Sequence, residues 1–267
     1  MRSHTSYFID HALYRLTVAD AKHVGCIEKE RHALLELKDS LVLDDTSLLL
    51  TWDSKSHDCC AWEGIGCSNQ TGHVENLDLN GNRFGIFHGE INASLMKLQH
   101  LKHLDLSENS FIGGRIRNDL SQLHYLDLSY NVLVGTIPHQ LGNLSHLQYL
   151  DLSLSHLVRT IPHQLGSLSN LQELHLGLNY LNVDLSHMYN LTLLTHIDLS
   201  HMSNLNSSHV WLQMIAKLPK IQELKLTYCG LSDPCLLSLF PSLMIFSNSL
   251  AILDLSYNTF SSSKIFE

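Results

Sequence analysis

Hydrophobic positions follow one short pattern that recurs along most of the chain. The string L-x-x-L-x-L-x-x-N appears eight times with substitutions, and its central triplets are separated by 27, 22, 24, 24, 23, 27 and 29 residues. Side chains alternate across a strand, so the outer residues of each triplet would face a core and the middle residue solvent. The eight predicted strands are centred on Leu77-Asp78-Leu79, Leu104-Asp105-Leu106, Leu126-Asp127-Leu128, Leu150-Asp151-Leu152, Leu174-His175-Leu176, Ile197-Asp198-Leu199, Leu224-Lys225-Leu226 and Leu253-Asp254-Leu255.

A single unit of this kind cannot bury its leucine face alone. Stacking the units side by side creates a continuous core under a parallel sheet, and the array curves into an arc. Repeats of about 20–29 residues with this consensus are leucine-rich repeats. The pattern therefore predicts an α/β solenoid with short parallel strands on its concave face.

A polar ladder is expected where each repeat turns inward. Its amides would bond backbone groups that the turn leaves unpaired. The expected asparagines, three residues after the second leucine, are Asn82, Asn109, Asn131, Asn179 and Asn258, and the substitutes are Ser155, Met202 and Cys229. Because cysteine is small and readily buried, Cys229 is predicted to be a buried ladder residue rather than half of a disulfide.

A helix is predicted before the repeats. Ile27, Leu34, Leu37 and Leu41 fall on one helical stripe. An open solenoid would expose its first leucine layer, and a helix laid across that end would cover it.

Four cysteines, Cys26, Cys59, Cys60 and Cys67, lie in the same N-terminal region. They lack the paired short spacings of a zinc site, so two disulfides and an oxidising compartment are predicted. The vicinal pair Cys59 and Cys60 is not expected to bond to itself, which leaves two possible pairings.

Composition narrows the class of protein. Leucine supplies 54 of 267 residues, and the formal net charge of −9 argues against a nucleic-acid-binding surface. Five sequons agree with export and predict glycosylation at Asn69, Asn92, Asn143, Asn190 and Asn206. Asp10, His11 and Arg15 interrupt the apolar run that a leader would need, and no apolar stretch of membrane-spanning length is present.

The chain shows no catalytic signature. A nucleophile elbow, a P-loop, a zinc-protease motif and the kinase motifs are all missing from the sequence. We therefore predict no enzyme, no cofactor and no metal site. His175 and His196 would be diagonal neighbours on adjacent strands, and solvated surface histidines are a simpler interpretation of them than metal ligands.

A rigid array of strands can display side chains for recognition. The Asp and Ser of L-D-L-S are repeat consensus, so positions that depart from it carry more information about a partner. The predicted ligand-binding residues on the concave face are Tyr125, Tyr130, Tyr149, Glu173, His175, His196, Glu223, Lys225 and Tyr228.

Longer motifs add a family resemblance. Gly135-Thr-Ile-Pro138-His-Gln-Leu-Gly142 and Thr160-Ile-Pro162-His-Gln-Leu-Gly166 resemble the plant-specific class of leucine-rich repeat. Cys26-Ile-Glu-Lys-Glu-Arg31, Leu50-x-Trp52 and Cys59-Cys60-x-Trp62-x-Gly64-Ile-x-Cys67 resemble the N-terminal cap of plant leucine-rich-repeat receptors. The resemblance is greatest to receptor-like proteins of the disease-resistance type, and receptor kinases share the cap. It implies disulfides Cys26–Cys59 and Cys60–Cys67, with Trp52 and Trp62 as packing residues.

The resemblance also implies a domain organisation. Residues 1–25 would be a degenerate or missing leader, residues 26–70 the disulfide-bonded cap, and residues 71–267 eight repeats of a C-terminally truncated ectodomain.

The implied function is recognition of a protein, peptide or glycan on the extracellular face of the plasma membrane. Signalling in defence would pass through a partner receptor kinase, and any membrane segment would lie outside this sequence. Two alternatives remain at this stage: a soluble apoplastic inhibitor of pathogen wall-degrading enzymes, similar to polygalacturonase inhibitors, and a non-functional fragment.

Overall fold

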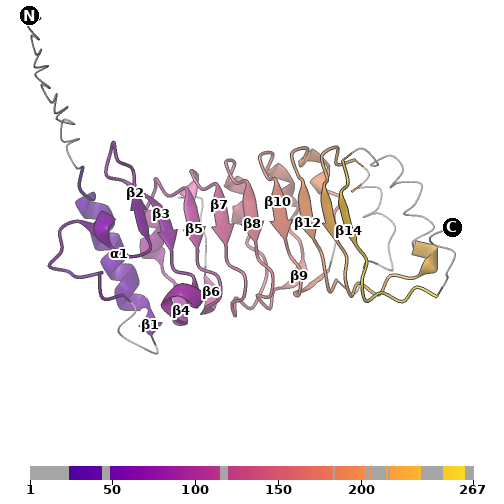
Figure 1. The fold of residues 1–267 in the computed structure, drawn as a ribbon, viewed down its shortest axis with the longest axis horizontal. Coiled ribbons are helices and arrows are strands. Elements are labelled where there is room, and N and C mark those ends of the chain that lie inside the picture. The colour runs from indigo at the N-terminus through magenta and orange to yellow at the C-terminus, as the bar shows by residue number, and fades with distance from the viewer. Residues whose placement is uncertain are drawn as a thin grey trace, which may run out of the picture.

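The computed structural model describes residues 24–43, 49–114, 120–182, 184–202, 205, 215, 217–235 and 249–261. These residues form a stacked array of repeats with a helix across its N-terminal end (Figure 1). No helix within these ranges is long and apolar enough to cross a membrane. The predicted leader lies almost entirely outside the described residues.

The first two residues of all eight predicted triplets lie in strands of one nine-stranded sheet, and the last leucine follows directly after each strand, which confirms the repeat assignment. The eight pair in parallel and in register, and β2 (Ile65–Cys67) adds an antiparallel strand at the N-terminal edge. The parallel strands are β3 (Val74–Asp78), β5 (His103–Asp105), β7 (Tyr125–Asp127), β8 (Tyr149–Asp151), β10 (Glu173–His175), β12 (His196–Asp198), β13 (Glu223–Lys225) and β14 (Ile252–Asp254).

The core is a stack of aligned aliphatic side chains. The first leucine of each triplet, or Ile197 in β12, is at most 2% exposed from Leu77 to Leu224. Leu253 in β14 is only partly buried and packs against the same core. Each repeat thus completes the core of its neighbour, as a solenoid requires.

The return path of the repeats carries short elements behind this sheet. β1 (Val42–Leu43), β4 (Phe87–Ile91) and β6 (Ser110–Gly114) form one small sheet, and β9 (Val158–Thr160) pairs with β11 (Tyr180–Asn182). Pro138 and Pro162 precede two of the 3₁₀ helices, and their fixed φ suits such a start. Among the described residues, the 3₁₀ helices of this side include η2 (Ala93–Lys97), η4 (His139–Asn143), η5 (His163–Ser167) and η6 (Met188–Asn190).

Helix α1 (Glu28–Ser40) covers the first repeat, as predicted. Leu34, Leu37 and Leu41 are buried, whereas Ile27 lies just before the helix and is partly buried. An ion pair between Glu36 of α1 and Lys97 of η2 joins the helix to the array.

Two disulfides, Cys26–Cys59 and Cys60–Cys67, join the cap segments in the pairing that the resemblance implied. The short helices η1 (Cys59–Ala61) and α2 (Gly81–Phe84) lie on either side of the β2–β3 hairpin. Trp52 and Trp62 stack with ring centroids 5.5 Å apart, and both are buried, so they pack the interior of the cap.

The polar ladder forms at most of the predicted positions. Asn131 illustrates it: its Nδ2 donates to the carbonyls of Leu106, Leu128 and Ser129, and its Oδ1 accepts from the N–H of Phe111. Asn109, Asn179 and Asn258 bond in the same way. Cys229 is a free, buried thiol whose Sγ lies 3.3 Å from the Leu199 carbonyl, so the prediction for it is confirmed.

The prediction for Asn82 is wrong. Asn82 lies exposed in α2, and its own N–H donates to the side chain of Asn80. A ladder amide bonds the carbonyl of the preceding repeat, but the element before β3 is the antiparallel strand β2 of the cap. Asn82 therefore has no equivalent turn behind it, and the ladder begins at Asn109.

Candidate recognition surface

The large sheet presents two columns of side chains on the face away from the leucine core, here called the sheet face. The residue before the central leucine or isoleucine of each of the eight parallel strands belongs to the first column, and the residue after it belongs to the third column, because the strands pair in register. The first column comprises Asn76, His103, Tyr125, Tyr149, Glu173, His196, Glu223 and Ile252. The third column comprises Asp78, Asp105, Asp127, Asp151, His175, Asp198, Lys225 and Asp254.

Aromatic rings stack along the first half of the sheet face. The centroid distances are 4.1 Å from His103 to Tyr125, 4.3 Å from Tyr125 to Tyr149, and 5.4 Å from Tyr149 to His175 in the third column. The rings of Tyr125 and Tyr149 stack face to face, and each hydroxyl donates to the aspartate two residues later, so the ring edges remain for a partner. Burial, with help from the aspartates of the third column, raises the pKa of both tyrosines, which keeps these hydroxyls protonated as donors.

His103 belongs to this stack, although it is not among the ligand-binding residues predicted from the sequence. Burial lowers the pKa of its imidazole, so the ring stays neutral near pH 7 and can lie flat against Tyr125. The signal that could have found it is its position one residue before the first leucine of its triplet, which Tyr125 and Tyr149 also occupy in theirs.

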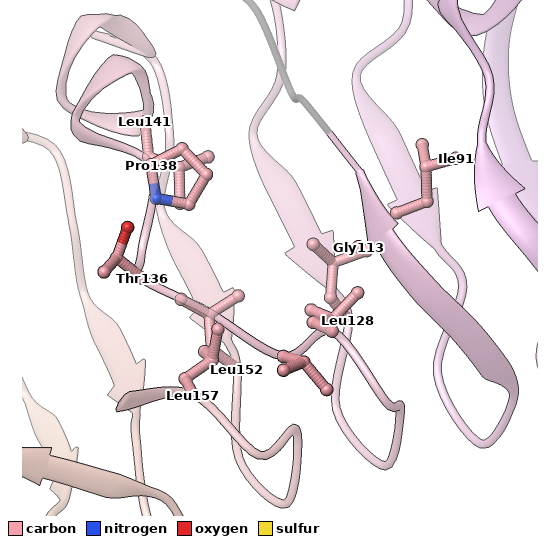
Figure 2. A pocket seen from close by; sticks show the side chains of 10 residues that line it. Ile91, Gly113, Leu128, Thr136, Pro138, Leu141, Leu152 and Leu157 are labelled. Carbon is pink, nitrogen blue, oxygen red and sulfur yellow. The ribbon is translucent and has the colours of Figure 1, made fainter. Parts of the chain in front are cut away.

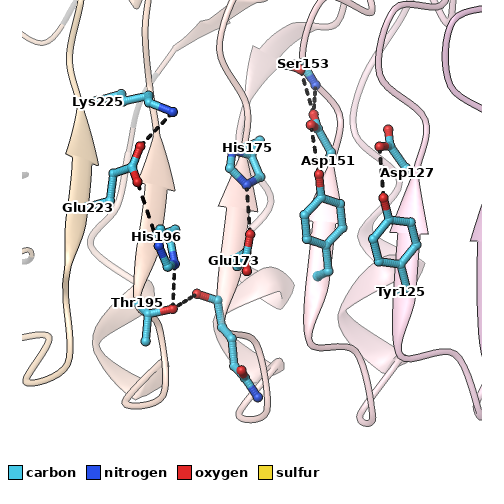
Figure 3. A network of polar contacts seen from close by, with 12 residues as sticks. Tyr125, Asp127, Asp151, Ser153, Glu173, His175, Thr195, His196, Glu223 and Lys225 are labelled. Atoms are coloured by element: carbon cyan, nitrogen blue, oxygen red, sulfur yellow. Dashed lines mark hydrogen bonds and ion pairs between the residues drawn. The ribbon is translucent and has the colours of Figure 1, made fainter. Parts of the chain in front are cut away.

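The aspartates of the third column are largely engaged within their own turns. Oδ1 of Asp127 accepts from the backbone N–H and the hydroxyl of Ser129, and Asp151 does the same with Ser153 (Figure 3). Their remaining oxygens lie 3.3 and 3.4 Å from the hydroxyls of Tyr125 and Tyr149. These carboxylates shape the turns and orient the rings, in agreement with their being repeat consensus.

The second half of the sheet face is a charged network. Glu223 lies 2.7 Å from Nζ of Lys225 and 3.8 Å from Nε2 of His196, while Glu173 lies 3.5 Å from His175 (Figure 3). The hydrogen bond from Lys225 lowers the pKa of Glu223, and the same bond raises the pKa of Lys225. Both groups are therefore charged at neutral pH.

The structure thus brings seven of the nine predicted ligand-binding residues together on the sheet face. Tyr130 and Tyr228 lie instead in the turns that follow their strands, with φ of 53° and 54°. Tyr228 stacks between His201 and Tyr257 at 4.6 and 4.5 Å, which makes a separate exposed row beside the sheet face. The strands end before these tyrosines, so strand alternation no longer determines their direction.

A hydrophobic cavity of about 250 Å³ opens between neighbouring repeats on the other side of the array (Figure 2). Thr136 is the single polar side chain among the described residues around it. Specific ligand sites usually combine an apolar lining with several oriented polar groups, so the sheet face is the better candidate for recognition. The cavity is lined by Ile91, Gly113, Leu128, Leu133, Val134, Thr136, Pro138, Leu141, Leu152 and Leu157.

Four of the predicted glycosylation sites lie among the described residues. Asn69, Asn143 and Asn190 are exposed. Asn92 is partly exposed and caps η2 through its side-chain oxygen, which accepts from the N–H of Ser94. Asn206 lies outside the described residues.

Asp127 gives the sheet face a testable dependence on pH. Burial, followed by repulsion from Asp151, raises the pKa of its carboxyl to about 6. The folded state then holds a proton that the unfolded state loses, so this group's stabilising effect is present in acid and lost as pH rises through about 6. Compared with Asp127→Asn, the wild type should lose about 1 kcal/mol of unfolding free energy between about pH 4.5 and 7.5, after allowance for solvent screening.

Urea unfolding at both pH values measures this difference. Asp254→Asn is the matched control, because hydrogen bonds from Ser256 lower the pKa of Asp254 and its stabilising contribution is lost only at more acidic pH, so this variant should follow the wild type between the two pH values. If the wild type instead became more stable relative to Asp127→Asn as the pH rose between these two values, the pKa of Asp127 would not be raised.

The chain matches known protein families and plant relatives. Residues 27–68 match the family described as leucine rich repeat N-terminal domain, and residues 97–116 and 122–144 match leucine-rich-repeat families. Receptor-like protein EIX1 of Solanum lycopersicum is 36% identical over 266 residues, which cover 89% of this chain and 22% of that protein. The chain belongs to the leucine-rich-repeat receptor-like proteins of plants.

Other relatives agree with this assignment. Receptor-like protein EIX2 of Solanum lycopersicum is 40% identical over 138 residues, covering 48% of this chain and 13% of that protein. The Arabidopsis receptor kinase HAESA, solved with the peptide hormone IDA and the co-receptor SERK1, superposes with a TM-score of 0.70 at 29% identity over 88% of this chain and 38% of that chain. The chain spans about a fifth of the length of EIX1 and less of EIX2.

Proposed function

We propose that this chain is an extracellular recognition module of a plant receptor-like protein and that its sheet face binds a peptide or a segment of a protein. Support comes from relatives whose ectodomains bind peptides: HAESA was solved with IDA, and GASSHO1/SCHENGEN3 of Arabidopsis with CASPARIAN STRIP INTEGRITY FACTOR 2 at a TM-score of 0.58 and 28% identity over 86% of this chain. In this role the chain is no enzyme.

The observation that carries the proposal is the change in the third column. From β3 to β8 every third-column residue is an aspartate, but β10 and β13 place His175 and Lys225 there. An aspartate at those positions would accept from its own turn, whereas His175 and Lys225 contact glutamates of the first column. These departures from aspartate create a patch of mixed charge that can pair with positively or negatively charged groups of a ligand.

The wider role follows from the family. We infer an extracellular location, glycans at the exposed sequons, and signalling in defence through a partner receptor kinase. The crystal structure of HAESA with SERK1 supports a co-receptor for such ectodomains. In the same proposal, residues 26–70 act as the cap and residues 71–267 as the repeats that display the site.

The test compares sheet-face and opposite-face variants. A phage-displayed library of random short peptides is selected on the immobilised wild-type protein. Enriched peptides are then measured against the double variant His175→Ala/Lys225→Ala and the control His139→Ala/His163→Ala. Both control residues are exposed and lie on η4 and η5, away from the sheet face.

We expect the enriched peptides to bind the sheet-face variant at least about tenfold more weakly, the effect of losing a hot-spot contact. The control variant should bind as the wild type does. A selection that enriches no peptide, or peptides that bind all three proteins equally, would contradict the proposal.

A further inference from the structure

Three potential metal ligands meet where the cap joins the first two repeats. Glu30 comes from α1, His73 immediately precedes β3, and His100 lies in the turn before β5. Each offers one ligand atom, and these atoms all lie within 4.8 Å of one another. No metal site is predicted from the sequence, and these three residues are separated by 43 and 27 positions, so they form no short motif that would indicate one.

Glu30 is held in a fixed position. It is 3% exposed, and its Oε1 lies 2.8 Å from Nδ1 of His73 while its Oε2 accepts from the N–H of Val74 at 2.7 Å. A buried carboxylate needs compensating positive charge or donors. Its contacts with one imidazole and one backbone amide leave room for a cation to add to that compensation.

The two imidazoles are also positioned by backbone contacts. The carbonyl of His73 accepts from the N–H of Ser68, which closes the turn before β3, and the turn around His100 is closed by the bond from Leu101 N–H to the Leu98 carbonyl. Their rings stack with centroids 3.7 Å apart and planes inclined by 28°. Imidazole nitrogens are the commonest metal ligands in proteins, and this stack places two of them beside the carboxylate of Glu30.

The donor set selects the kind of ion. Two imidazole nitrogens and one carboxylate oxygen suit Zn²⁺, whereas Ca²⁺ and Mg²⁺ prefer oxygen ligands alone. Tetrahedral ligands at about 2.0–2.1 Å from zinc stand about 3.3 Å apart. Ligand atoms that lie up to 4.8 Å apart must therefore close by at most about 1.5 Å, whereas Oε1 of Glu30 and Nδ1 of His73, which lie 2.8 Å apart, must separate slightly. His100 is exposed and can make most of that movement, and water would complete the coordination.

We propose that Glu30, His73 and His100 bind one Zn²⁺ ion, which fastens α1 to the first two repeats. The ion would add its charge to the buried carboxylate of Glu30 and join three segments that are distant in sequence. A ligand that binds only the folded state raises stability by mass action. Zinc should therefore raise the unfolding temperature of the protein, and the effect should saturate at one ion per chain.

The test is a titration of the chain, prepared without a histidine tag, with ZnCl₂ alone. Isothermal calorimetry gives stoichiometry and affinity, and thermal unfolding gives the stabilisation. The variants are His100→Ala, which leaves the Glu30–His73 contact in place and should fold, and His124→Ala as the matched control. His124 is half-buried and forms a second histidine pair with the exposed His146, at a centroid distance of 5.7 Å.

We expect the wild type and His124→Ala to bind one Zn²⁺ with the same affinity and His100→Ala to bind at least about tenfold more weakly. Excess EDTA should reverse the rise in unfolding temperature. The proposal is overturned if wild type and His100→Ala bind zinc equally, if His124→Ala weakens binding as much as His100→Ala, or if zinc leaves the unfolding temperature of the wild type unchanged.

Discussion

Removing the Cys26–Cys59 disulfide with Cys26→Ser/Cys59→Ser is expected to lower the free energy of unfolding by about 4 kcal/mol. The bond spans a sequence separation of 33 and ties the segment before α1 to η1, and Cys59 is fully buried. Without it the unfolded chain gains conformational freedom, while the cap keeps only its noncovalent contacts. Exposure of the first leucine layer should follow, because α1 is the element that covers that end of the core.

The second disulfide provides the comparison. Cys60–Cys67 closes a loop with a sequence separation of only 7. By the same chain-entropy relation, Cys60→Ser/Cys67→Ser should lower the free energy of unfolding by about 2 kcal/mol. Urea unfolding of both variants gives the two losses, and binding of a hydrophobic dye reports exposure of the leucine layer. Equal losses, or a larger loss for Cys60–Cys67, would show that loop length is not what makes these bonds stabilising.

The repeats could be predicted because their information is local. Each strand is specified by a triplet and each turn by a residue three positions later, so a single repeat contains the pattern of its own fold. The disulfide pairing is different, because vicinal Cys59 and Cys60 leave two chemically reasonable arrangements. The structure contains the pairing that the family resemblance implied.

The recognition surface could be predicted only in part, because its geometry arises between repeats. Strand alternation placed residues such as Tyr125 and Lys225 on the sheet face. It gave no indication that Tyr125 and Tyr149 would cover each other's rings, or that His103 would extend the stack. It also failed for Tyr130, since the strand has ended and the backbone has turned to positive φ.

The cluster of Glu30, His73 and His100 could not be predicted from the sequence at all, because it also arises between separate parts of the fold. These side chains approach one another only because α1 is laid across the array and two successive turns are brought into register. Contacts of this kind depend on how the cap docks on the repeats, and no local spacing in the sequence encodes that.

Replacing Asn109 with alanine is expected to cost about 3 kcal/mol, whereas Asn82→Ala should change stability by less than about 0.5 kcal/mol. Both asparagines occupy the same position of the repeat consensus. Asn109 Nδ2 donates to the carbonyls of Leu79, Leu106 and Ser107 at 2.8–3.0 Å, and its Oδ1 accepts from the N–H of Phe87 at 2.8 Å. Alanine would leave these backbone groups buried without a partner, which costs more than the bonds themselves contribute.

Asn82 is the matched control that the chain itself provides. Its side chain is exposed in α2, and the capping bond at this helix uses its backbone N–H, which alanine retains. Urea unfolding of the two single variants gives the comparison directly. Similar losses for both would mean that Asn82 also supports a turn and that the ladder begins one repeat earlier. A loss confined to Asn109→Ala would show that the consensus asparagine stabilises a repeat only when another turn of the solenoid lies behind it.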